Sequence, residues 1–302
     1  MKYTITDEDN GVTVKNYLYG KLKFSTAMVK RVKYREGGIK VNGENVTVRR
    51  ALSAGDVLEL LYEDRSEDEN EYTVPVDIPI EIVYEDEFLT VVNKPPMMPA
   101  HPSLGHKNDT VANALAYRYK GAPYVFRPVN RLDRDTSGLM LIARDKLAAG
   151  KLYLSQRKGE IHKSYIAILE GALEPPSGEI TTYMAREGDS IVKRRVCDET
   201  DPGAKIAVTR YETLLSAENI SVVRAVPVTG RTHQLRVHFS HMGCPIFGDT
   251  MYGSPSELIS RQALHAAHLD FPHPATGDII SLDAPVPEDM IGLLSEFGIV
   301  KS

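Results

Sequence analysis

The sequence lacks the features that mark membrane, secreted and disulfide-rich proteins. No apolar run approaches the roughly 20 residues that a membrane-spanning helix requires, and the N-terminal stretch MKYTITDEDNGVTVKN has no apolar core typical of a secretory signal. Cys197 and Cys244 stand far apart in the sequence, without the spacing of metal ligands. These absences predict a soluble cytoplasmic protein.

Motifs for a bound cofactor or metal are equally scarce. Gly243 and Gly248 have the spacing of a phosphate-binding loop, but Asp249 stands where that loop requires a lysine. There is no G-x-S-x-G nucleophile elbow. The histidines between His233 and His268 do not follow the H-E-x-x-H pattern of zinc enzymes. We therefore expect any chemistry here to need neither a cofactor nor a metal.

The net charge is informative only when it is divided along the chain. A formal charge of −5 and a pI near 6.0 argue against a nucleic-acid partner. Residues 11–50, however, carry a net charge of +8, residues 63–87 carry −10, and residues 127–165 carry +5. Local patches set the field that a polyanion meets, so the two basic regions favour RNA as a partner.

The length of 302 residues suggests about two domains. We expect a small N-terminal module at residues 1–65, an acidic linker at 66–79 and a larger domain at 80–302. The stretch EDRSEDENEY, at residues 63–72, is typical of a solvated linker.

Within the N-terminal module, the apolar spacing predicts two short helices, over residues 12–23 and 25–35. Ser25 is the expected N-cap of the second helix. Asn42-Gly43 predicts a tight turn between two strands, and residues 55–62 predict a closing strand.

Strand and helix signals alternate through the larger domain, which predicts an α+β domain with a substantial sheet. The expected strands lie at 81–84, 89–93, 139–145, 163–171, 207–214 and 221–229, and the expected helices at 146–157 and 232–243.

The stretch NRLDRDTSG, at residues 130–138, interleaves two arginines with two aspartates just before an apolar strand. Asp133 would stand at the mouth of that strand, and a carboxylate beside arginines stays ionised, which suits a nucleophile. The alternative is a set of loop ion pairs, which this stretch alone favours. Arg231 shifts the balance, because a cation at a helix start opposes the macrodipole unless it faces an anion such as Asp133 or an RNA phosphate. An arginine that reaches into solvent is the other explanation of Arg231.

The larger domain resembles the RluA-type pseudouridine synthases over roughly residues 80–295. It has their successive motifs in order: YEDEFLTVVNKPPMMPAHP (84–102), RLDRDTSGLMLIARD (131–145), KSYIAILEG (163–171), GAKIAVTRY (203–211), VTGRTHQLRVHFSHMGCPIFGDTMYG (228–253) and LHAAHLDFPHP (264–274). The N-terminal module is similar to the S-four-type (α-L) RNA-binding domain through its helix and Val-Asn-Gly pattern, although it lacks the usual Ser-Arg start of the second helix.

The resemblance implies a central, mainly antiparallel mixed sheet flanked by helices, and isomerisation of uridine to pseudouridine in structured RNA without a cofactor. Asp133 matches the catalytic aspartate, which either attacks the anomeric carbon or removes a ribose proton. Tyr165 matches the aromatic residue stacked on the target base, a candidate for removing the proton at carbon five. Arg231 matches the arginine paired with the aspartate, and Arg131 the arginine that fills the gap left by the flipped base. Leu264 matches part of the apolar wall of the pocket.

Further RNA contacts are expected from basic side chains in three places: Arg134 in the loop that carries Asp133, Lys30, Arg31 and Lys33 in the N-terminal module, and Lys193, Arg194 and Arg195 in a later loop. A solvated run of charge is the alternative for the last three.

Two positions depart from the family pattern. Asn130 stands where the family commonly has histidine, and an asparagine can still form hydrogen bonds there. Met97 stands where a small residue is usual. The alternatives to a synthase are a non-catalytic RNA-binding or ribosome-assembly protein and a hydrolase of the N-glycosidic bond. The expected substrate is large-subunit ribosomal RNA or else tRNA, and the expected state is a monomer without membrane contacts.

Overall fold

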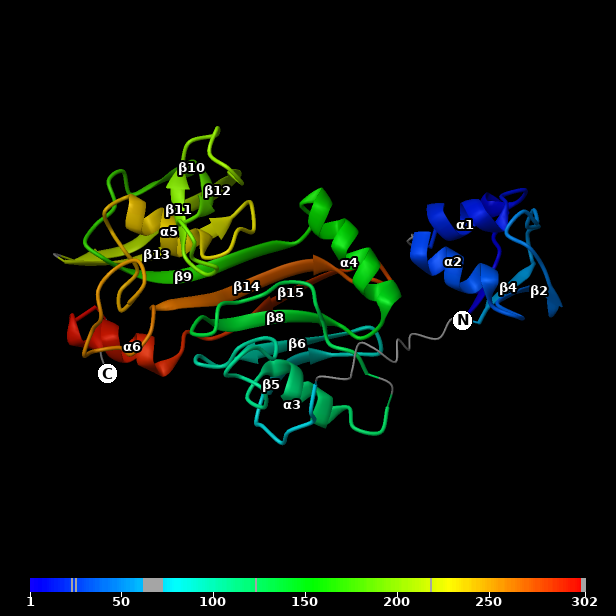
Figure 1. The fold of residues 1–302 in the computed structure, drawn as a ribbon, viewed down its shortest axis with the longest axis horizontal. Coiled ribbons are helices and arrows are strands. Elements are labelled where there is room, and N and C mark those ends of the chain that lie inside the picture. The colour runs from blue at the N-terminus through cyan, green and yellow to red at the C-terminus, as the bar shows by residue number, and fades with distance from the viewer. Residues whose placement is uncertain (23, 25, 62–72, 123, 218, 300–302) are drawn as a thin grey trace.

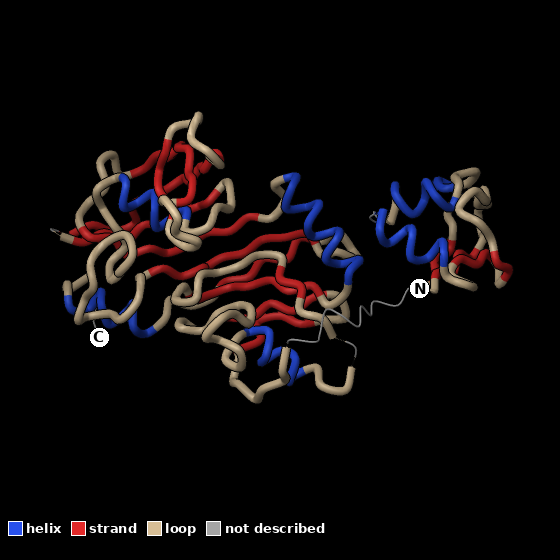
Figure 2. The backbone as a smooth tube through the Cα atoms, in the orientation of Figure 1, coloured by secondary structure: helices blue, strands red, loops and turns tan. Residues whose placement is uncertain are grey.

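The computed structural model describes residues 1–22, 24, 26–61, 73–122, 124–217 and 219–299. They form two sheets, one of four strands in the order β1-β4-β2-β3 and one of eleven strands (Figures 1 and 2). The expected linker segment 63–72 and the expected N-cap Ser25 lie outside the described residues. Within the described ranges, no helix combines the length and the apolar character needed to cross a membrane.

The four-stranded sheet and two helices gather around a hydrophobic cluster of their own, which includes Val14, Leu18, Val32 and Leu58. The hairpin between β2 and β3 has a loop of two residues, Asn42 and Gly43, both with positive φ, as the sequence predicted. The elements are β1 (Lys2–Thr4), the 3₁₀ helix η1 (Asp7–Asp9), α1 (Val14–Gly20), α2 (Thr26–Tyr34), β2 (Ile39–Val41), β3 (Glu44–Asn45) and β4 (Val57–Leu60).

The larger sheet runs in the order β11-β10-β12-β13-β9-β14-β8-β6-β5, with β15 paired to β14 and β7 paired to β8. Of its described strand pairs, only β14 with β8 is parallel, so the expected mixed and mainly antiparallel sheet is confirmed. Its strands are β5 (Glu81–Glu85), β6 (Leu89–Lys94), β7 (Arg127–Pro128), β8 (Ser137–Ala143), β9 (His162–Glu170), β10 (Ser177–Arg186), β11 (Arg194–Cys197), β12 (Lys205–Ala217), β13 (Ile220–Pro227), β14 (Leu264–Pro272) and β15 (Ile279–Asp283).

Helices cover both faces of the larger sheet around β8, and all residues of this strand are therefore buried. Alternate residues of β8 enter different clusters: Leu139 and Leu141 pack with α4, whereas Met140 and Ile142 pack with α3. Figure 1 shows α3 and α4 on opposite sides of these strands. The helices of this domain are α3 (Val111–Arg118), α4 (Lys146–Lys158), α5 (Gln234–His241) and α6 (Glu288–Glu296).

A close approach of two backbones lies behind the loop that carries Asp133. Gly138, at the start of β8, has φ +110° and pairs with Ala266 of β14. A Cβ atom on Gly138 would stand 2.2 Å from the Ala266 carbonyl oxygen. Only glycine combines this φ with this spacing, so Gly138 sets the junction of β8 and β14.

We expect Gly138→Ala to lower the free energy of unfolding by more than about 3 kcal/mol, through the strained φ and the clash with Ala266. Gly150→Ala in α4 is the matched control, because a Cβ there meets nothing within 4 Å. It should raise stability by about 0.5–1 kcal/mol through helix propensity. Urea unfolding followed by circular dichroism measures both, and equal effects of the two substitutions would contradict this account.

Candidate active site

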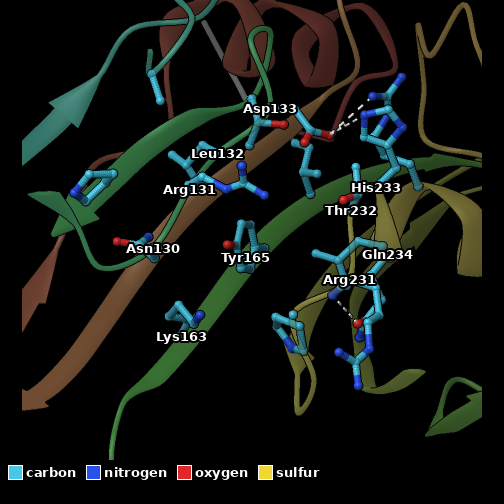
Figure 3. A pocket seen from close by; sticks show the side chains of 18 of the residues that line it. Asn130, Arg131, Leu132, Asp133, Lys163, Tyr165, Arg231, Thr232, His233 and Gln234 are labelled. Atoms are coloured by element: carbon cyan, nitrogen blue, oxygen red, sulfur yellow. Dashed lines mark hydrogen bonds and ion pairs between the residues drawn. The ribbon is translucent and has the colours of Figure 1, made fainter. Parts of the chain in front are cut away.

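A cavity of about 520 Å³ opens where the loop before β8 faces β9 and the turn before α5 (Figure 3). Six of the residues singled out from the sequence line it: Arg131, Asp133, Arg134, Tyr165, Arg231 and Leu264. The remaining predicted RNA contacts do not line this cavity. Lys30 and Lys33 are exposed on α2, the side chain of Arg31 is outside the described part, and residues 193–195 lie at the start of β11.

Asp133 forms an ion pair with Arg236 of α5, whose Nη1 lies 3.2 Å from the Asp133 Oδ2. The other edge of the same guanidinium forms a fork with Asp249, with Nε–Oδ2 and Nη2–Oδ1 distances of 2.7 and 2.8 Å. Asp249 is fully buried and also accepts the backbone N–H groups of Met251 and Tyr252. Burial lowers the pKa of Arg236, but Asp249 and Asp133 outweigh it and raise that pKa. The arginine is therefore held charged and in a fixed orientation beside Asp133.

The predicted pairing of Arg231 with Asp133 is wrong in this structure. Helix α5 begins at Gln234, so Arg231 lies in the turn before the helix and not in its first turn. The Arg231 Nε donates to the Ile206 carbonyl at 2.9 Å, and the side chain lines the outer part of the pocket. Arg236 was a detectable alternative, because it lies between Leu235 and Val237 in the same motif, where a buried cation needs an acidic partner.

His233 places its ring between Asp133 and Tyr252. Its Nε2 lies 3.9 Å from the Asp133 Oδ2, and its Nδ1 lies 2.9 Å from the Tyr252 hydroxyl. That hydroxyl accepts the Arg194 N–H at 2.8 Å, so it can donate its own proton to Nδ1. We assign the neutral ring proton to Nε2, facing Asp133. Burial lowers the pKa of His233 although Asp133 opposes this, so the ring is neutral at neutral pH.

The backbone of His233 is itself unusual. Its φ of +57° lies in the left-handed region, which costs a side chain with a Cβ about 1–3 kcal/mol. The sequence analysis considered this histidine only as a possible zinc ligand, and nothing in the spacing of the motif indicated a left-handed residue before α5 that turns the ring toward Asp133.

Tyr165 lies on β9 with its side chain buried and facing the pocket. Its partners on the neighbouring strands are Ala225 of β13 and Ala266 of β14. These small side chains leave room over the ring, since directly opposed residues share one face of a sheet. Burial and the charge of Asp133 both raise the pKa of Tyr165, so its hydroxyl stays protonated at neutral pH.

Lys94 holds the loop of Asp133 by a hydrogen bond to the Arg134 carbonyl, a role that the sequence analysis did not predict. Its side chain is fully buried, and its Nζ donates to the carbonyls of Pro95, Met98 and Arg134, each at 2.8 Å. Three acceptors match the three N–H groups of an ammonium. Burial lowers the pKa of Lys94 to about 7, while Asp135 opposes the shift.

The remaining predicted residues divide into paired and unpaired side chains. Arg131 is exposed and forms no ion pair with the described residues. Arg134 forks onto Asp135 at 2.7 and 3.0 Å. Lys193 pairs with Glu187 and Arg195 with Asp201, at 3.0 and 2.8 Å, whereas the Arg194 guanidinium donates to three carbonyls of its own loop, those of Ile191, Val192 and Lys193.

Asn130 and Met97 depart from the family pattern, and the structure explains only the first. Asn130 is buried, donates to the Leu139 carbonyl and accepts the Leu141 N–H, so it ties the loop to β8. Met97 has φ +63°, in the left-handed region that favours glycine, and nothing in the structure explains the methionine. In the described ranges, no group of three or more His, Cys, Asp or Glu side chains is placed to hold a metal ion.

Several known proteins are similar to this chain in sequence and in fold. The family model for RNA pseudouridylate synthase matches residues 89–241. The uncharacterised RNA pseudouridine synthase YjbO of Bacillus subtilis is 37% identical over 94% of this chain and 98% of its own. Ribosomal large subunit pseudouridine synthase D of Zymomonas mobilis is 40% identical over 72% of each chain. The structure of human RNA pseudouridylate synthase domain containing 1 superposes with a TM-score of 0.57 at 30% identity, over 68% of this chain and 83% of its own.

We expect Arg236→Ala to lower the free energy of unfolding by about 3–5 kcal/mol, because it leaves the fully buried Asp249 without its cation. Arg231→Ala is the control and should cost less than about 1 kcal/mol, since it removes one exposed hydrogen bond to a carbonyl. Urea unfolding of the two variants measures the difference. A larger loss for Arg231→Ala would overturn the assignment of Arg236 as the partner of both aspartates.

Proposed function

This chain belongs to the RNA pseudouridine synthase family, and we propose that it isomerises a specific uridine of large-subunit ribosomal RNA with Asp133 as the catalytic carboxylate. The family makes the protein an isomerase that acts on RNA. The choice of RNA is supported by relatives named ribosomal large subunit pseudouridine synthase D, which are 40% identical in Zymomonas mobilis and 36% in Pseudomonas aeruginosa.

The observation that carries the proposal is the fixed Asp133 carboxylate opposite Tyr165 in one pocket. The isomerisation breaks the bond between uracil N1 and the anomeric carbon, turns the base, and joins carbon five to that carbon. Asp133 serves either as a nucleophile at the anomeric carbon or as the base that takes a ribose proton to give a glycal. Arg236 orients the carboxylate through their ion pair and places a positive charge beside it for either step.

The target base has to leave its stack to reach Asp133. Unstacking costs a few kcal/mol, and stacking of the extruded uracil on Tyr165 offsets part of it. In this proposal Arg131, which lines the pocket and is unpaired among the described residues, fills the gap with its planar guanidinium. The raised pKa of Tyr165 means that its hydroxyl can take the proton of carbon five only if it passes its own proton on. Burial is the main cause of the raised pKa of Tyr165, and the negative charge of Asp133 raises it further.

The N-terminal module supplies the second RNA contact in this proposal. Residues 1–65 resemble an S-four-type RNA-binding domain, and Lys30 and Lys33 are exposed on α2. Phosphate contacts of this kind raise affinity for any RNA without reading its sequence. We therefore assign substrate capture to the module and chemistry to residues 80–302. As a separate part of the proposal, we take the working unit to be a monomer.

We expect Asp133→Asn to abolish release of tritium from carbon five of uridine while RNA binding stays within about threefold of the wild type, because the amide keeps the size of the side chain but supplies neither nucleophile nor base. The substrates are tritiated transcripts of large-subunit ribosomal RNA and of tRNA. Release from tRNA alone would overturn the ribosomal assignment. Binding without release from either transcript would indicate an RNA-binding protein, and free uracil would indicate a hydrolase.

We expect His233→Ala to lower the turnover number about 10-fold and to leave the affinity for RNA unchanged, because the ring N–H faces the Asp133 carboxylate at 3.9 Å and is expected to close to a hydrogen bond when substrate is bound. His233→Gln should recover most of the rate, since its amide N–H reaches toward the position of Nε2. Tritium release under single-turnover conditions measures both variants. Equal rates for the two variants would show that the donor near Asp133 has no role in the reaction.

A further inference from the structure

Lys163 is a desolvated cation in the pocket that the protein leaves without a counterion. It lies on β9, and it lines the pocket together with Tyr165 and Gln156. In the described part of the chain, no carboxylate or other acceptor contacts its ammonium, and burial lowers its pKa. Lys163 is only partly buried, so water solvates its ammonium in the free protein, and an anion that enters the pocket can take the place of that water.

Two other lysines, the buried Lys94 and the partly buried Lys151, have the acceptors that Lys163 lacks. Lys94 donates to three backbone carbonyls. Lys151 of α4 donates to the Pro274 carbonyl at 2.7 Å, and burial lowers its pKa as well. Both ammonium groups therefore tie segments of the fold together. Burial also lowers the pKa of Lys163, but its ammonium ties no segments of the fold together. This difference indicates that Lys163 serves in binding.

The geometry of β9 directs Lys163 toward the target nucleotide. Side chains two residues apart on a strand share a face and stand about 6.6 Å from each other, so Lys163 flanks the Tyr165 ring. Figure 3 shows Lys163 and Asp133 on different sides of Tyr165. Gln156, at the exposed end of α4, also lines the pocket and is joined to Lys163 by the short α4–β9 turn. Lys163 thus stands at the side of the pocket where the RNA backbone can enter.

We infer that Lys163 binds a phosphate of the RNA strand beside the target uridine and so seats the flipped nucleotide on Tyr165. This inference rests on the proposed function, because it takes the occupant of the pocket to be RNA. Phosphate is the anion that RNA presents at every nucleotide, and a lysine ammonium binds it as a compact point charge at the end of a long stem.

The test measures binding of a large-subunit ribosomal RNA transcript over a series of KCl concentrations. We expect Lys163→Met to weaken binding about 10-fold at low salt. The slope of log K against log [KCl] should fall by about 0.7–0.9, the share of one phosphate. Lys163→Arg keeps the charge and should keep the slope.

Lys151→Met is the matched control, because it removes a partly buried ammonium that already has a protein acceptor. It should melt at a lower temperature and keep the wild-type slope, whereas Lys163→Met should melt at the same or a higher temperature, since it removes an unpaired desolvated charge.

An unchanged slope in Lys163→Met would overturn the inference. A lower turnover number with an unchanged slope would assign Lys163 to the uracil ring, which overturns it too. Tritium release by the wild type on the same transcript distinguishes these results from failure of the proposed function. If the wild type binds the transcript without release, the proposed function fails, and the slopes still decide the role of Lys163.

Discussion

The bridge that Arg236 makes between Asp249 and Asp133 is the constraint on which the site depends. Asp249 is fully buried, so its carboxylate requires both the arginine fork and the backbone N–H groups of residues 251 and 252. Those contacts fix the plane of the guanidinium and leave its Nη1 directed at Asp133. The buried side chain of Arg236 therefore joins α5, the segment after it and the loop before β8 through two ion pairs. The carboxylate at the centre of the proposed reaction takes its orientation from a residue that is itself rigidly held.

The loop of Asp133 is tied to the rest of the domain at several points along its length. Asn130 ties its start to the β8 backbone, and Lys94 holds the Arg134 carbonyl. Arg261, which forks onto Asp289 of α6, donates to the Asp135 carbonyl at 3.2 Å. Gly138 then lets β8 approach β14 closely enough for the loop to emerge beside Tyr165. Such a loop has little freedom to lose when substrate binds, and this is how a scaffold positions a reactive carboxylate in advance.

The sequence predicted the parts of the fold that have strong local signals. The apolar run at residues 139–143 predicted β8, and Asn42-Gly43 predicted the hairpin of the N-terminal sheet. The helices α3 and α6 were not predicted, and their length is not the reason, because α5 has eight residues as α3 does and was predicted. The choice of Arg231 over Arg236 failed for a different reason. The start of α5 depends on His233 in a left-handed conformation, and no local preference of histidine indicates that. Lys94 was missed because a lysine suggests a surface position until three carbonyls are seen around it.

The basic residues fall into two groups, those that form an ion pair within the chain and those that form none among the described residues. Arg134, Lys193 and Arg195 have carboxylate partners within the chain, so a phosphate that approached them would compete with an existing pair. Arg131 and Lys163 have no such partner among the described residues, and both line the pocket of Asp133 and Tyr165. A protein with a net charge of −5 can therefore still present positive charge to RNA where the reaction needs it. The electrostatic potential at the site depends mainly on the unpaired cations, because the charge of a paired cation is largely cancelled by its carboxylate partner.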